Sequence, residues 1–322
     1  MTRTTSLYEP VLAEMGQVEE TLTSLARVDT PWLADMLAAV LFAGGKRMRP
    51  AVSLLSGKFG DFKPELSVPL ATSLELLHTA SLVHDDVIDG AGTRRGRPTA
   101  GSLFDNHGAV VLGDYIFAQA AALVARTGHA EVVRLFAETM VMMSMAQLAE
   151  DRAAFDYNQT VDDYLRLIRG KTASLFAIAT QGGALLSGAS QDEALALRSY
   201  GENLGMAFQI VDDILDFSGD EREMGKPVGS DLMQGTLTLP SLLLIQRHPV
   251  DNPVRHLFQD NGGSKHLKEA IELVCGSDIL SEAYATAKDF GDAARSALSS
   301  LPATRERESL DEIAEYALER RA

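Results

Sequence analysis

Apolar residues recur along most of the chain at intervals of three and four positions, which is the spacing of one face of an α-helix. The run from Leu70 to Leu77, with Ala71 and Leu74 between them, is one example of this pattern. Runs of alternating Val and Ile, which would indicate strands, are scarce, and Ala, Leu, Met and Glu dominate instead. The pattern therefore predicts an all-α protein.

Turns rich in glycine and proline divide this pattern into helical segments of about 12 to 25 residues. The breaks fall at 44–45, 57–64, 90–99, 128, 170, 182–188, 219–235 and 260–264. Because no Pro/Ser-rich linker or low-complexity stretch separates two halves, we predict one domain over residues 1–322. The last segment, 303–322, has the pattern of an amphipathic helix with solvated charges.

The composition limits the functions that such a protein can serve. Of 322 residues, 46% are hydrophobic, and the formal net charge is −16, so the chain lacks the basic footprint of a nucleic-acid-binding protein. The single cysteine, Cys275, excludes an intramolecular disulfide and fits a cytoplasmic location. Residues 1–10 lack the apolar core of a signal peptide, and no apolar run approaches the ~18 residues of a membrane span. We therefore expect no transmembrane segment.

Two acidic clusters of the form Asp-Asp-x-x-Asp interrupt apolar helical segments. The first contains Asp85, Asp86 and Asp89, and the second contains Asp212, Asp213 and Asp216. Residues four apart lie on one helix face, so the first and last carboxylates of each cluster repel one another. A divalent cation compensates that cost, and carboxylate oxygens suit Mg²⁺ that bridges to a phosphate. The clusters therefore predict a helical cavity in which Mg²⁺ holds a diphosphate.

Basic residues follow glycines in four turns near these clusters. They are Lys46, Arg47 and Arg49, then Arg94, Arg95 and Arg97, then Lys171, and finally Lys226. Guanidinium and ammonium groups suit phosphate oxygens, so these turns supply the positive charge that the acidic chain otherwise lacks. Gly170-Lys171-Thr172 is not a P-loop, because Leu165 stands where that motif has glycine and no strand precedes it.

Six motifs, in this order, resemble those of the trans-isoprenyl diphosphate synthases. They are Gly-Gly-Lys-Arg-Met-Arg-Pro at 44–50, His78, the first acidic cluster with Arg-Arg-Gly-Arg-Pro-Thr at 85–99, Gly-Lys-Thr at 170–172, Phe-Gln-Ile-Val-Asp-Asp-Ile-Leu-Asp at 208–216, and Gly-Lys-Pro at 225–227. Any one motif would be weak, but all six in order are very specific. The resemblance spans roughly residues 42–240 and implies a single-domain, all-α bundle of the isoprenoid synthase type around a deep central cavity.

The resemblance also implies a role for each matching residue. Lys46, Arg49, His78 and Arg95 would bind the diphosphate of isopentenyl diphosphate. Asp85, Asp89 and Asp212 would bind Mg²⁺ directly, with Asp86, Asp213 and Asp216 as further ligands or supporting groups. Arg94, Lys171 and Lys226 would hold the allylic diphosphate, and Thr172 and Gln209 would face the reacting carbons, which makes Lys171, Thr172, Gln209 and Lys226 the candidate catalytic set.

The activity that the resemblance implies is that of a prenyltransferase. About three Mg²⁺ ions per active site, together with the basic residues, would stabilise the charge on the departing pyrophosphate. The allylic cation would be attacked by the double bond of isopentenyl diphosphate, and loss of a proton would complete one C5 addition. The resemblance further implies a homodimer, products that serve as quinone side chains, and transient membrane contact at product release.

Small residues before the first acidic cluster predict a long product. Ala80 and Ser81 lie about one helical turn before Asp85, where shorter-chain members of the family commonly carry large aromatics. Leu77, about one further turn toward the start of the same helix, is not aromatic either. The growing tail should pass these residues, which favours a product of about C30 to C40. Candidates for the floor of the tunnel on a facing helix are Phe136, Met142 and Met143.

One departure from the family pattern and three alternative functions remain. Many relatives have lysine where this chain has Thr236, so one diphosphate contact is lost or moved, although Asp231 keeps its place. A short-chain farnesyl or geranylgeranyl diphosphate synthase would differ only in the tunnel floor. A terpene cyclase usually lacks a matched second cluster. A non-catalytic subunit of a heteromeric synthase normally loses aspartates or basic turns that this chain retains.

Overall fold

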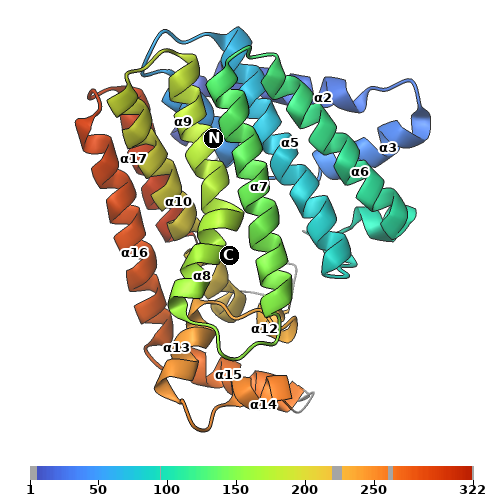
Figure 1. Cartoon of the computed structure of the whole chain (residues 1–322), viewed down its shortest axis with the longest axis vertical. Helices are drawn as coiled ribbons and strands as arrows, with labels where there is room; N and C mark the ends of the chain where they lie inside the picture. The colour runs from blue at the N-terminus through green and yellow to red at the C-terminus, as the bar shows by residue number, and fades with distance from the viewer. Residues whose placement is uncertain (1–5, 95, 220–226, 260–263, 321–322) are drawn as a thin grey trace. The chain divides into compact units, whose positions relative to one another are not determined.

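Helices make up most of the computed structural model, which describes residues 6–94, 96–219, 227–259 and 264–320 (Figure 1). The chain divides into two compact units, each assembled from three segments. The first unit contains Met1–Glu138, Leu175–Gly201 and Ala297–Ile313, and the second contains Thr139–Ser174, Glu202–Ser296 and Ala314–Ala322. The all-α class is confirmed, and one domain over residues 1–322 stays a prediction.

The first unit is built around the long helix α5 (Pro64–Ile88), which packs against α2 (Leu12–Ala26), α4 (Met48–Gly57) and α6 (Ala100–Ala125). Pro64 stands in the first turn of α5, where the missing N–H of proline costs no helical hydrogen bond. The other elements of this unit are η1 (Glu9–Val11), α3 (Pro31–Leu41), the start of α7 (Ala130–Ala153), nearly all of α9 (Ser174–Leu186), the start of α10 (Gln191–Ser218), η3 (Leu298–Ser300) and most of α17 (Arg305–Glu319).

A short antiparallel hairpin connects α5 to α6. β1 (Thr93–Arg94) pairs with β2 (Arg97–Pro98), and these are the only strands among the described residues. Thr99 then caps α6, because its hydroxyl accepts a hydrogen bond from the Ser102 amide at 3.2 Å. The hairpin, which the helical pattern does not predict, fixes the backbone of Arg94 after the first acidic cluster.

The second unit has its own hydrophobic core, which includes Tyr164, Ile210, Leu242 and Ala283. Helix α8 (Val161–Ile168) begins at a capping box formed by Thr160 and Asp163. The remaining elements are the end of α7, the π-helical turn η2 (Arg169–Ala173), the end of α10, α12 (Ser230–Met233), α13 (Leu239–Arg247), α14 (Pro253–Gln259), α15 (Ser264–Cys275), α16 (Ile279–Ala297) and the end of α17.

The break predicted at 182–188 is wrong over its first residues, because α9 continues through Gly182 and Gly183 to Leu186. A Cβ atom on Gly183 would lie 2.2 Å from the Ser53 carbonyl oxygen of α4. Glycine at this position therefore allows two helices to approach closely and does not mark a turn.

Three helices have the length and hydropathy of a membrane span, contrary to the expectation that no apolar run is long enough. They are α5, α6 and α7, with mean hydropathies of 1.3, 1.6 and 1.3 over their most apolar windows. The buried shares of these windows are 72%, 39% and 22%, respectively. The apolar surface of α5 thus belongs to the core, whereas α6 and α7 leave apolar side chains exposed.

Candidate active site

The first acidic cluster lies at the C-terminal end of α5, in the first unit. Asp85 is partly exposed, and Asp89, whose amide donates to the Asp85 carbonyl oxygen at 2.8 Å, is exposed. The helix dipole concentrates partial negative charge at this end, so carboxylates here destabilise the helix unless a cation is near. The cluster therefore presents two accessible carboxylates where a cation is electrostatically favoured.

Asp86, between these two residues, has a different environment. It is 7% exposed, and its Oδ1 accepts a hydrogen bond from Arg94 Nε at 2.6 Å. Burial raises the pKa of the Asp86 carboxyl, and the charge and hydrogen bond of Arg94 oppose that rise. The pair holds Arg94 beside the cluster while 37% of the arginine side chain remains exposed.

The second acidic cluster lies in the last turns of α10, in the second unit. The Asp212 side chain is 41% exposed, and its Oδ1 lies 2.7 Å from Nη2 of Arg320, the residue that follows α17. The Arg320 guanidinium also lies 4.1 Å from the centroid of the Phe208 ring, one turn earlier on α10. The prediction that the charges of segment 303–322 are solvated is therefore wrong for Arg320, whose side chain is only 15% exposed.

Asp213, the second residue of this cluster, is 4% exposed. Its two oxygens accept hydrogen bonds from Tyr164 Oη at 2.6 Å and from Gln209 Nε2 at 2.9 Å. Burial, reinforced by the charge of Asp231, raises the pKa of the Asp213 carboxyl well above its usual range, and the two hydrogen bonds oppose the rise. Protein donors therefore occupy both of its oxygens.

Asp216, the last residue of the cluster, is fully buried. Its Oδ1 accepts a hydrogen bond from Ser230 Oγ at 2.8 Å, and its Oδ2 accepts a longer one from the Asp231 amide at 3.4 Å. Its own carbonyl oxygen accepts from the Gly229 amide at 2.8 Å. Asp216 thus ties the end of α10 to the start of α12.

Lys171 and Thr172 lie in η2, and the break predicted at Gly170 is wrong, because α8 continues directly into this π-helical turn. Such π-helical turns often occur at functional sites, since the extra residue changes where side chains point. Lys171 forms an ion pair with Glu150 of α7. Thr172 is 8% exposed, and its hydroxyl donates to Gln209 Oε1 at 2.7 Å. Thr172, Gln209 and Asp213 therefore form one hydrogen-bonded chain.

The predicted pocket for isopentenyl diphosphate draws on the turn before α4 and on α5. Lys46 is exposed, and its carbonyl oxygen accepts a hydrogen bond from Tyr8 Oη at 2.9 Å. The Arg49 guanidinium lies 4.6 Å from the centroid of the Phe176 ring, and His78 is partly exposed on α5. All of these residues belong to the first unit.

Arg47, in the same basic turn, has a structural environment. It adopts a left-handed backbone conformation with φ 47° and donates to Glu19 at 2.8 Å, to Glu75 at 2.7 Å and to the Leu41 carbonyl oxygen at 2.8 Å. Glu75 is 6% exposed, so removing Arg47 would leave the Glu75 carboxylate as a buried charge without this partner. Arg47 therefore shapes the turn that carries its two basic neighbours.

The candidate chain-length residues differ in exposure. Ala80 and Leu77 are 0% and 1% exposed, whereas Ser81 retains partial exposure and donates its hydroxyl to the His78 carbonyl oxygen at 2.8 Å. Phe136, a candidate for the tunnel floor, is 2% exposed in the first unit. Of Ala80 and Ser81, only Ser81 therefore has accessible surface.

Two predicted site residues, Arg95 and Lys226, lie outside the described residues.

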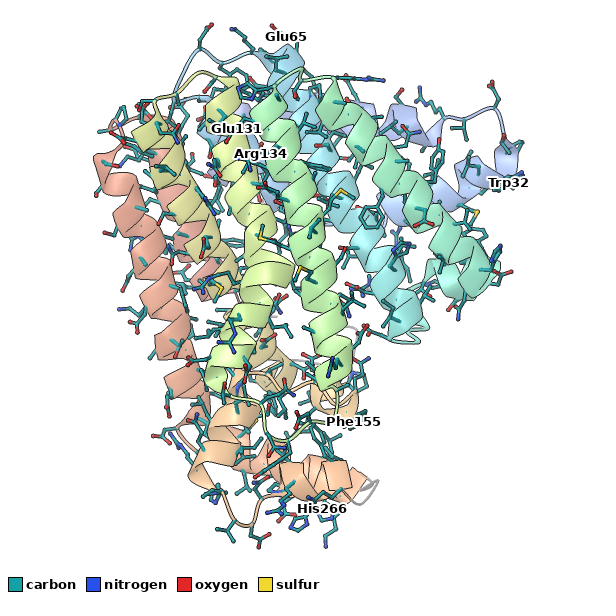
Figure 2. The ribbon with its side chains drawn as sticks, in the orientation of Figure 1. Trp32, Glu65, Glu131, Arg134, Phe155 and His266 are labelled. Carbon is teal, nitrogen blue, oxygen red and sulfur yellow. The ribbon has the colours of Figure 1, made fainter. Side chains whose placement is uncertain are left out.

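The loop that contains Thr236, where the chain departs from the family pattern, is held by hydrogen bonds of its backbone. The Thr236 amide donates to the Asp231 carbonyl oxygen at 2.9 Å. Gly235, with φ +86°, accepts a hydrogen bond from the Phe155 amide at 2.9 Å, and a Cβ on it would lie 2.6 Å from the Phe155 ring. The backbone of this loop is therefore held by local hydrogen bonds and by one from Phe155, which lies much earlier in the chain. Phe155, which is labelled in Figure 2, has φ 62°. Its ring packs edge-on against that of Phe258, with ring centroids 5.3 Å apart.

Comparison with known proteins decides the family. The polyprenyl synthetase family model matches residues 30–274. Component 2 of the heptaprenyl diphosphate synthase of Bacillus subtilis (strain 168) is 38% identical over 94% of this chain and 87% of that protein. A chloroplastic solanesyl-diphosphate synthase 2 of Oryza sativa subsp. japonica is 37% identical over 98% of this chain and 79% of that protein.

The chain belongs to the polyprenyl synthetase family. Its fold is similar to that of a polyprenyl synthase from Caulobacter crescentus CB15, whose crystal structure is a complex with calcium and isoprenyl diphosphate. The TM-score is 0.94, with 33% identity over 99% of this chain and 98% of that one. A decaprenyl diphosphate synthase from Rhodobacter capsulatus gives a TM-score of 0.91 and 34% identity over 98% of both chains. The predicted isoprenoid synthase fold and the enzyme class, prenyltransferase, are thereby confirmed.

The accessible side chains of both clusters fit the divalent metal that a polyprenyl synthetase implies. They are carboxylates, the hard ligands that Mg²⁺ and Ca²⁺ prefer. Asp212 already attracts a cationic group, since Arg320 lies 2.7 Å from it. Among the described residues, no three or more His, Cys, Asp or Glu side chains gather into a complete metal site. Water or a bound diphosphate would therefore supply the remaining ligands.

Two polar residues that bear on the candidate site could not be predicted from the sequence, namely Tyr164 and Glu150, which contact Asp213 and Lys171. Arg320, which contacts Asp212, belongs to a basic C-terminal pair that only loosely resembles the tails of some relatives. None stands in a recognised motif, and each reaches its partner only through the tertiary fold. The one signal in the sequence is weak, namely that Arg320 is a basic residue near the end of an amphipathic segment.

Proposed function

We propose that this chain is a Mg²⁺-dependent, long-chain trans-polyprenyl diphosphate synthase. It adds isopentenyl diphosphate to an allylic diphosphate, head to tail, until the product reaches about C30 to C40. The observation that supports this most strongly is the placement of both acidic clusters at helix C-termini, with accessible carboxylates and basic residues beside them. Relatives named as heptaprenyl, solanesyl and octaprenyl diphosphate synthases agree with a long product.

In this proposal, Asp85, Asp89 and Asp212 bind the metal, because they are the cluster residues with accessible surface. Bound Mg²⁺, about three ions per active site, would neutralise the allylic diphosphate and lower the barrier to ionisation of its C–O bond. The buried residues Asp86, Asp213 and Asp216 hold neighbouring groups in place.

Basic side chains would hold the two diphosphates. Arg94 and Lys171 bind the allylic diphosphate after exchanging their carboxylate partners, Asp86 and Glu150, for phosphate oxygens. Lys46, Arg49 and His78 bind isopentenyl diphosphate, and Arg95 and Lys226 keep the roles that their motifs imply. The net charge of −16 makes these local cations necessary for binding any diphosphate.

Thr172 and Gln209 would stabilise the allylic cation through their oxygen atoms. The π-electrons of isopentenyl diphosphate form the new C–C bond, and the departed pyrophosphate accepts the proton that is lost. Exclusion of water is required, because water would trap the cation as an alcohol. Small side chains at Ala80 and Ser81, followed by Leu77, let the tail extend.

Incubation of the purified chain with farnesyl diphosphate, radiolabelled isopentenyl diphosphate and Mg²⁺ tests this proposal. After dephosphorylation, chromatography should show polyprenols of about C30 to C40, and EDTA should abolish them. Products no longer than geranylgeranyl would support a short-chain synthase instead. Cyclic hydrocarbon from the allylic diphosphate alone would indicate a cyclase. Absence of incorporation, restored by a second chain, would indicate one subunit of a heteromeric enzyme, an arrangement suggested by the "component 2" relatives.

We also propose that the enzyme is a homodimer, since apolar side chains are exposed on α6 and along one face of α7. On α6, Leu103, Val110 and Val111 are 49%, 41% and 53% exposed. On α7, Val141, Met145 and Leu148 are 58%, 65% and 68% exposed and follow the i, i+4, i+7 spacing. Near the start of α7, by contrast, Arg134 pairs with Glu131 (Figure 2). Such apolar faces typically mark protein interfaces.

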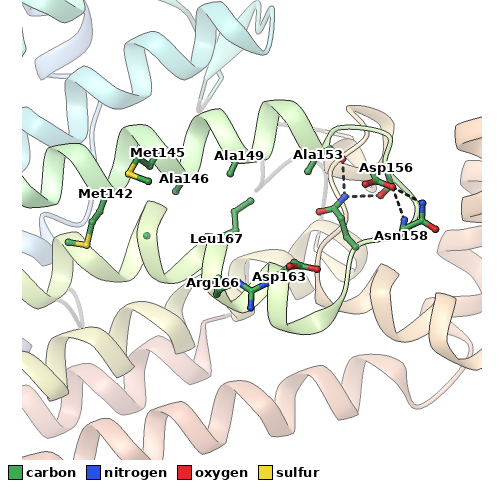
Figure 3. Close-up of a pocket in the computed structure, with 12 residues that line it drawn as sticks. Met142, Met145, Ala146, Ala149, Ala153, Asp156, Asn158, Asp163, Arg166 and Leu167 are labelled. Carbon is green, nitrogen blue, oxygen red and sulfur yellow. Dashed lines mark hydrogen bonds and ion pairs between the residues drawn. The ribbon is translucent and has the colours of Figure 1, made fainter.

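Met145 also borders a groove of about 550 Å³ between α7 and α8 (Figure 3). Met145→Glu should shift the protein from dimer to monomer in sedimentation equilibrium. The matched control is Val250→Glu, because Val250 is 82% exposed in a loop of the second unit. Equal dimerisation of both variants would exclude this face of α7 from the interface. Cytoplasmic location and supply of quinone side chains remain further parts of the proposal.

A further inference from the structure

Tyr164 carries a buried hydroxyl that no motif of the family explains. It lies on α8 and is 3% exposed within the core of the second unit. Its hydroxyl donates to Asp213 Oδ2 at 2.6 Å, across 49 positions of sequence. A buried tyrosine hydroxyl needs a partner, but that need does not require a carboxylate of an acidic cluster.

The hydrogen bond continues through two candidate catalytic residues. Asp213 Oδ1 accepts from Gln209 Nε2 at 2.9 Å, and Gln209 Oε1 accepts from the Thr172 hydroxyl at 2.7 Å. The NH₂ group of Gln209 is the donor in the first of these contacts, so it faces Asp213. The amide oxygen must then face Thr172, whose single proton is used in that contact.

This polarity determines what Thr172 presents to a substrate. Because its proton points to Gln209, the lone pairs of its oxygen are left to face other groups. Lone pairs stabilise a carbocation, whereas a hydroxyl proton directed at the cation would repel it. The direction of the whole chain therefore matters for the proposed reaction, and it depends on the orientation of the Asp213 carboxylate.

Tyr164 fixes that orientation. Without its hydroxyl, Oδ2 of a carboxylate that is 4% exposed would lose a donor. The negative charge of Asp231 also acts on Asp213. It would repel Oδ2 once this oxygen had lost the hydrogen bond from Tyr164. The carboxylate can recover a donor by turning both oxygens toward Gln209, which pulls the amide away from Thr172.

We propose that Tyr164 is a positioning residue that holds Asp213, and through it Gln209 and Thr172, in the polarity required to stabilise the allylic cation. This inference rests on the proposed prenyltransfer. It assigns a role in the rate of the chemical step and none in the binding of either diphosphate.

Tyr164→Phe tests the inference, because it removes one oxygen and keeps the ring that packs in the core. The matched control is Tyr200→Phe. Tyr200 is fully buried in the first unit, and its hydroxyl donates to the Leu310 carbonyl oxygen at 2.7 Å, with no link to the acidic clusters. Both variants should lose similar thermal stability.

The kinetic results should differ between them. In Tyr164→Phe, kcat should fall about 10- to 100-fold, while KM for both diphosphates changes less than about threefold. In Tyr200→Phe, both parameters should stay within about twofold of the wild type. Equal kcat values in the two variants, or a rise in KM without a fall in kcat, would overturn the inference. If wild-type protein incorporates no isopentenyl diphosphate, the proposed function itself has failed, and the two failures are thereby distinguished.

A double-mutant cycle with Gln209→Leu gives an independent readout. If Tyr164 acts through Gln209, the double variant should be no slower than the slower single variant. Multiplying effects would show independent roles and overturn the inference. Should Tyr164→Phe unfold at the assay temperature, all variants are assayed at a lower temperature at which circular dichroism shows that it is folded. The same fall in kcat at constant KM relative to Tyr200→Phe is then expected, and equal kcat values would again contradict the proposal.

Discussion

The two acidic clusters share one sequence pattern but have different surroundings. In the first, the outer two carboxylates keep accessible surface, and the middle one is buried against Arg94. In the second, only the first carboxylate is accessible, and it pairs with Arg320. The other two are buried against Tyr164, Gln209, Ser230 and a backbone amide.

This difference separates two ways in which a fold can use aspartate. An accessible carboxylate at a helix C-terminus lowers stability and attracts cations, so it suits metal binding. A buried carboxylate with two donors adds stability through those donors and fixes the groups around it. In the proposed function, the first cluster therefore acts mainly as a cation site, whereas the second contributes one cation ligand attached to a structural network.

The largest expected effect is on catalysis and follows replacement of an accessible carboxylate of the first cluster. Asp85→Asn should lower kcat/KM about 10²- to 10³-fold, because one metal ligand and one charge are lost. The thermal midpoint of the unliganded protein should stay the same or rise, since a repulsion at the end of α5 is relieved. Steady-state kinetics and calorimetry measure both quantities. A clear loss of stability with activity retained would place Asp85 in a structural network and remove the distinction between the clusters.

The second effect is on stability and concerns the fully buried member of the second cluster. Asp216→Ala should lower the free energy of unfolding by about 1–3 kcal/mol, because Ser230 and the Asp231 amide lose their acceptor. Urea denaturation monitored by circular dichroism measures this change. The matched control is Asp89→Ala, at an exposed position of the same motif, which should change stability by less than about 0.5 kcal/mol. Equal losses in both variants would show that position in the motif, and not burial, sets the cost.

Much of this comparison could be predicted from the sequence, and part of it could not. The helices that carry the clusters follow from apolar periodicity, and α5 and α10 lie where that pattern indicates. The charge of the clusters and the four-residue spacing are local properties, so a cation site could be predicted before any fold was known.

Which aspartate of each cluster is accessible could not be predicted, because burial depends on tertiary partners. Asp213 is buried against Tyr164, which is 49 positions away, and Asp212 pairs with Arg320, which follows α17. The π-helical turn at Lys171 also has no local signal beyond one glycine. At Gly183 the sequence wrongly predicted a turn, because glycine is required both in turns and where two helices pack closely, as they do here.

A smaller effect is expected from the cation that already occupies the second cluster. Arg320→Gln should strengthen divalent metal binding about two- to fivefold, because the metal no longer competes with a partly exposed ion pair of about 0.5–1 kcal/mol. Calorimetric titration of Mn²⁺ in the presence of inorganic pyrophosphate measures the affinity without turnover. Arg305→Gln is the control, since Arg305 pairs only with exposed glutamates on α17 and Glu9 among the described residues. Weaker binding in Arg320→Gln would make this arginine a ligand of the diphosphate and contradict the competition.

The last comparison concerns substitution of the residue four positions before each cluster. We expect the smallest change in rate here, together with a change in product length for the first cluster alone. Before the first cluster this residue is Ser81, and before the second it is Phe208, whose ring lies against Arg320. Ser81→Phe should shorten the product while kcat for the first addition stays within about threefold, because the substitution lies about one turn from the metal ligands. Ser81 is a better site for this test than Ala80, which is fully buried, so that a ring there would disturb the core of the first unit. Phe208→Ser should leave product length unchanged, since only the first cluster is proposed to lie at the mouth of the tunnel. If Phe208→Ser altered the chain length and Ser81→Phe did not, the tunnel would belong to the second cluster, and the assignment of different tasks to the two clusters would have to be reversed.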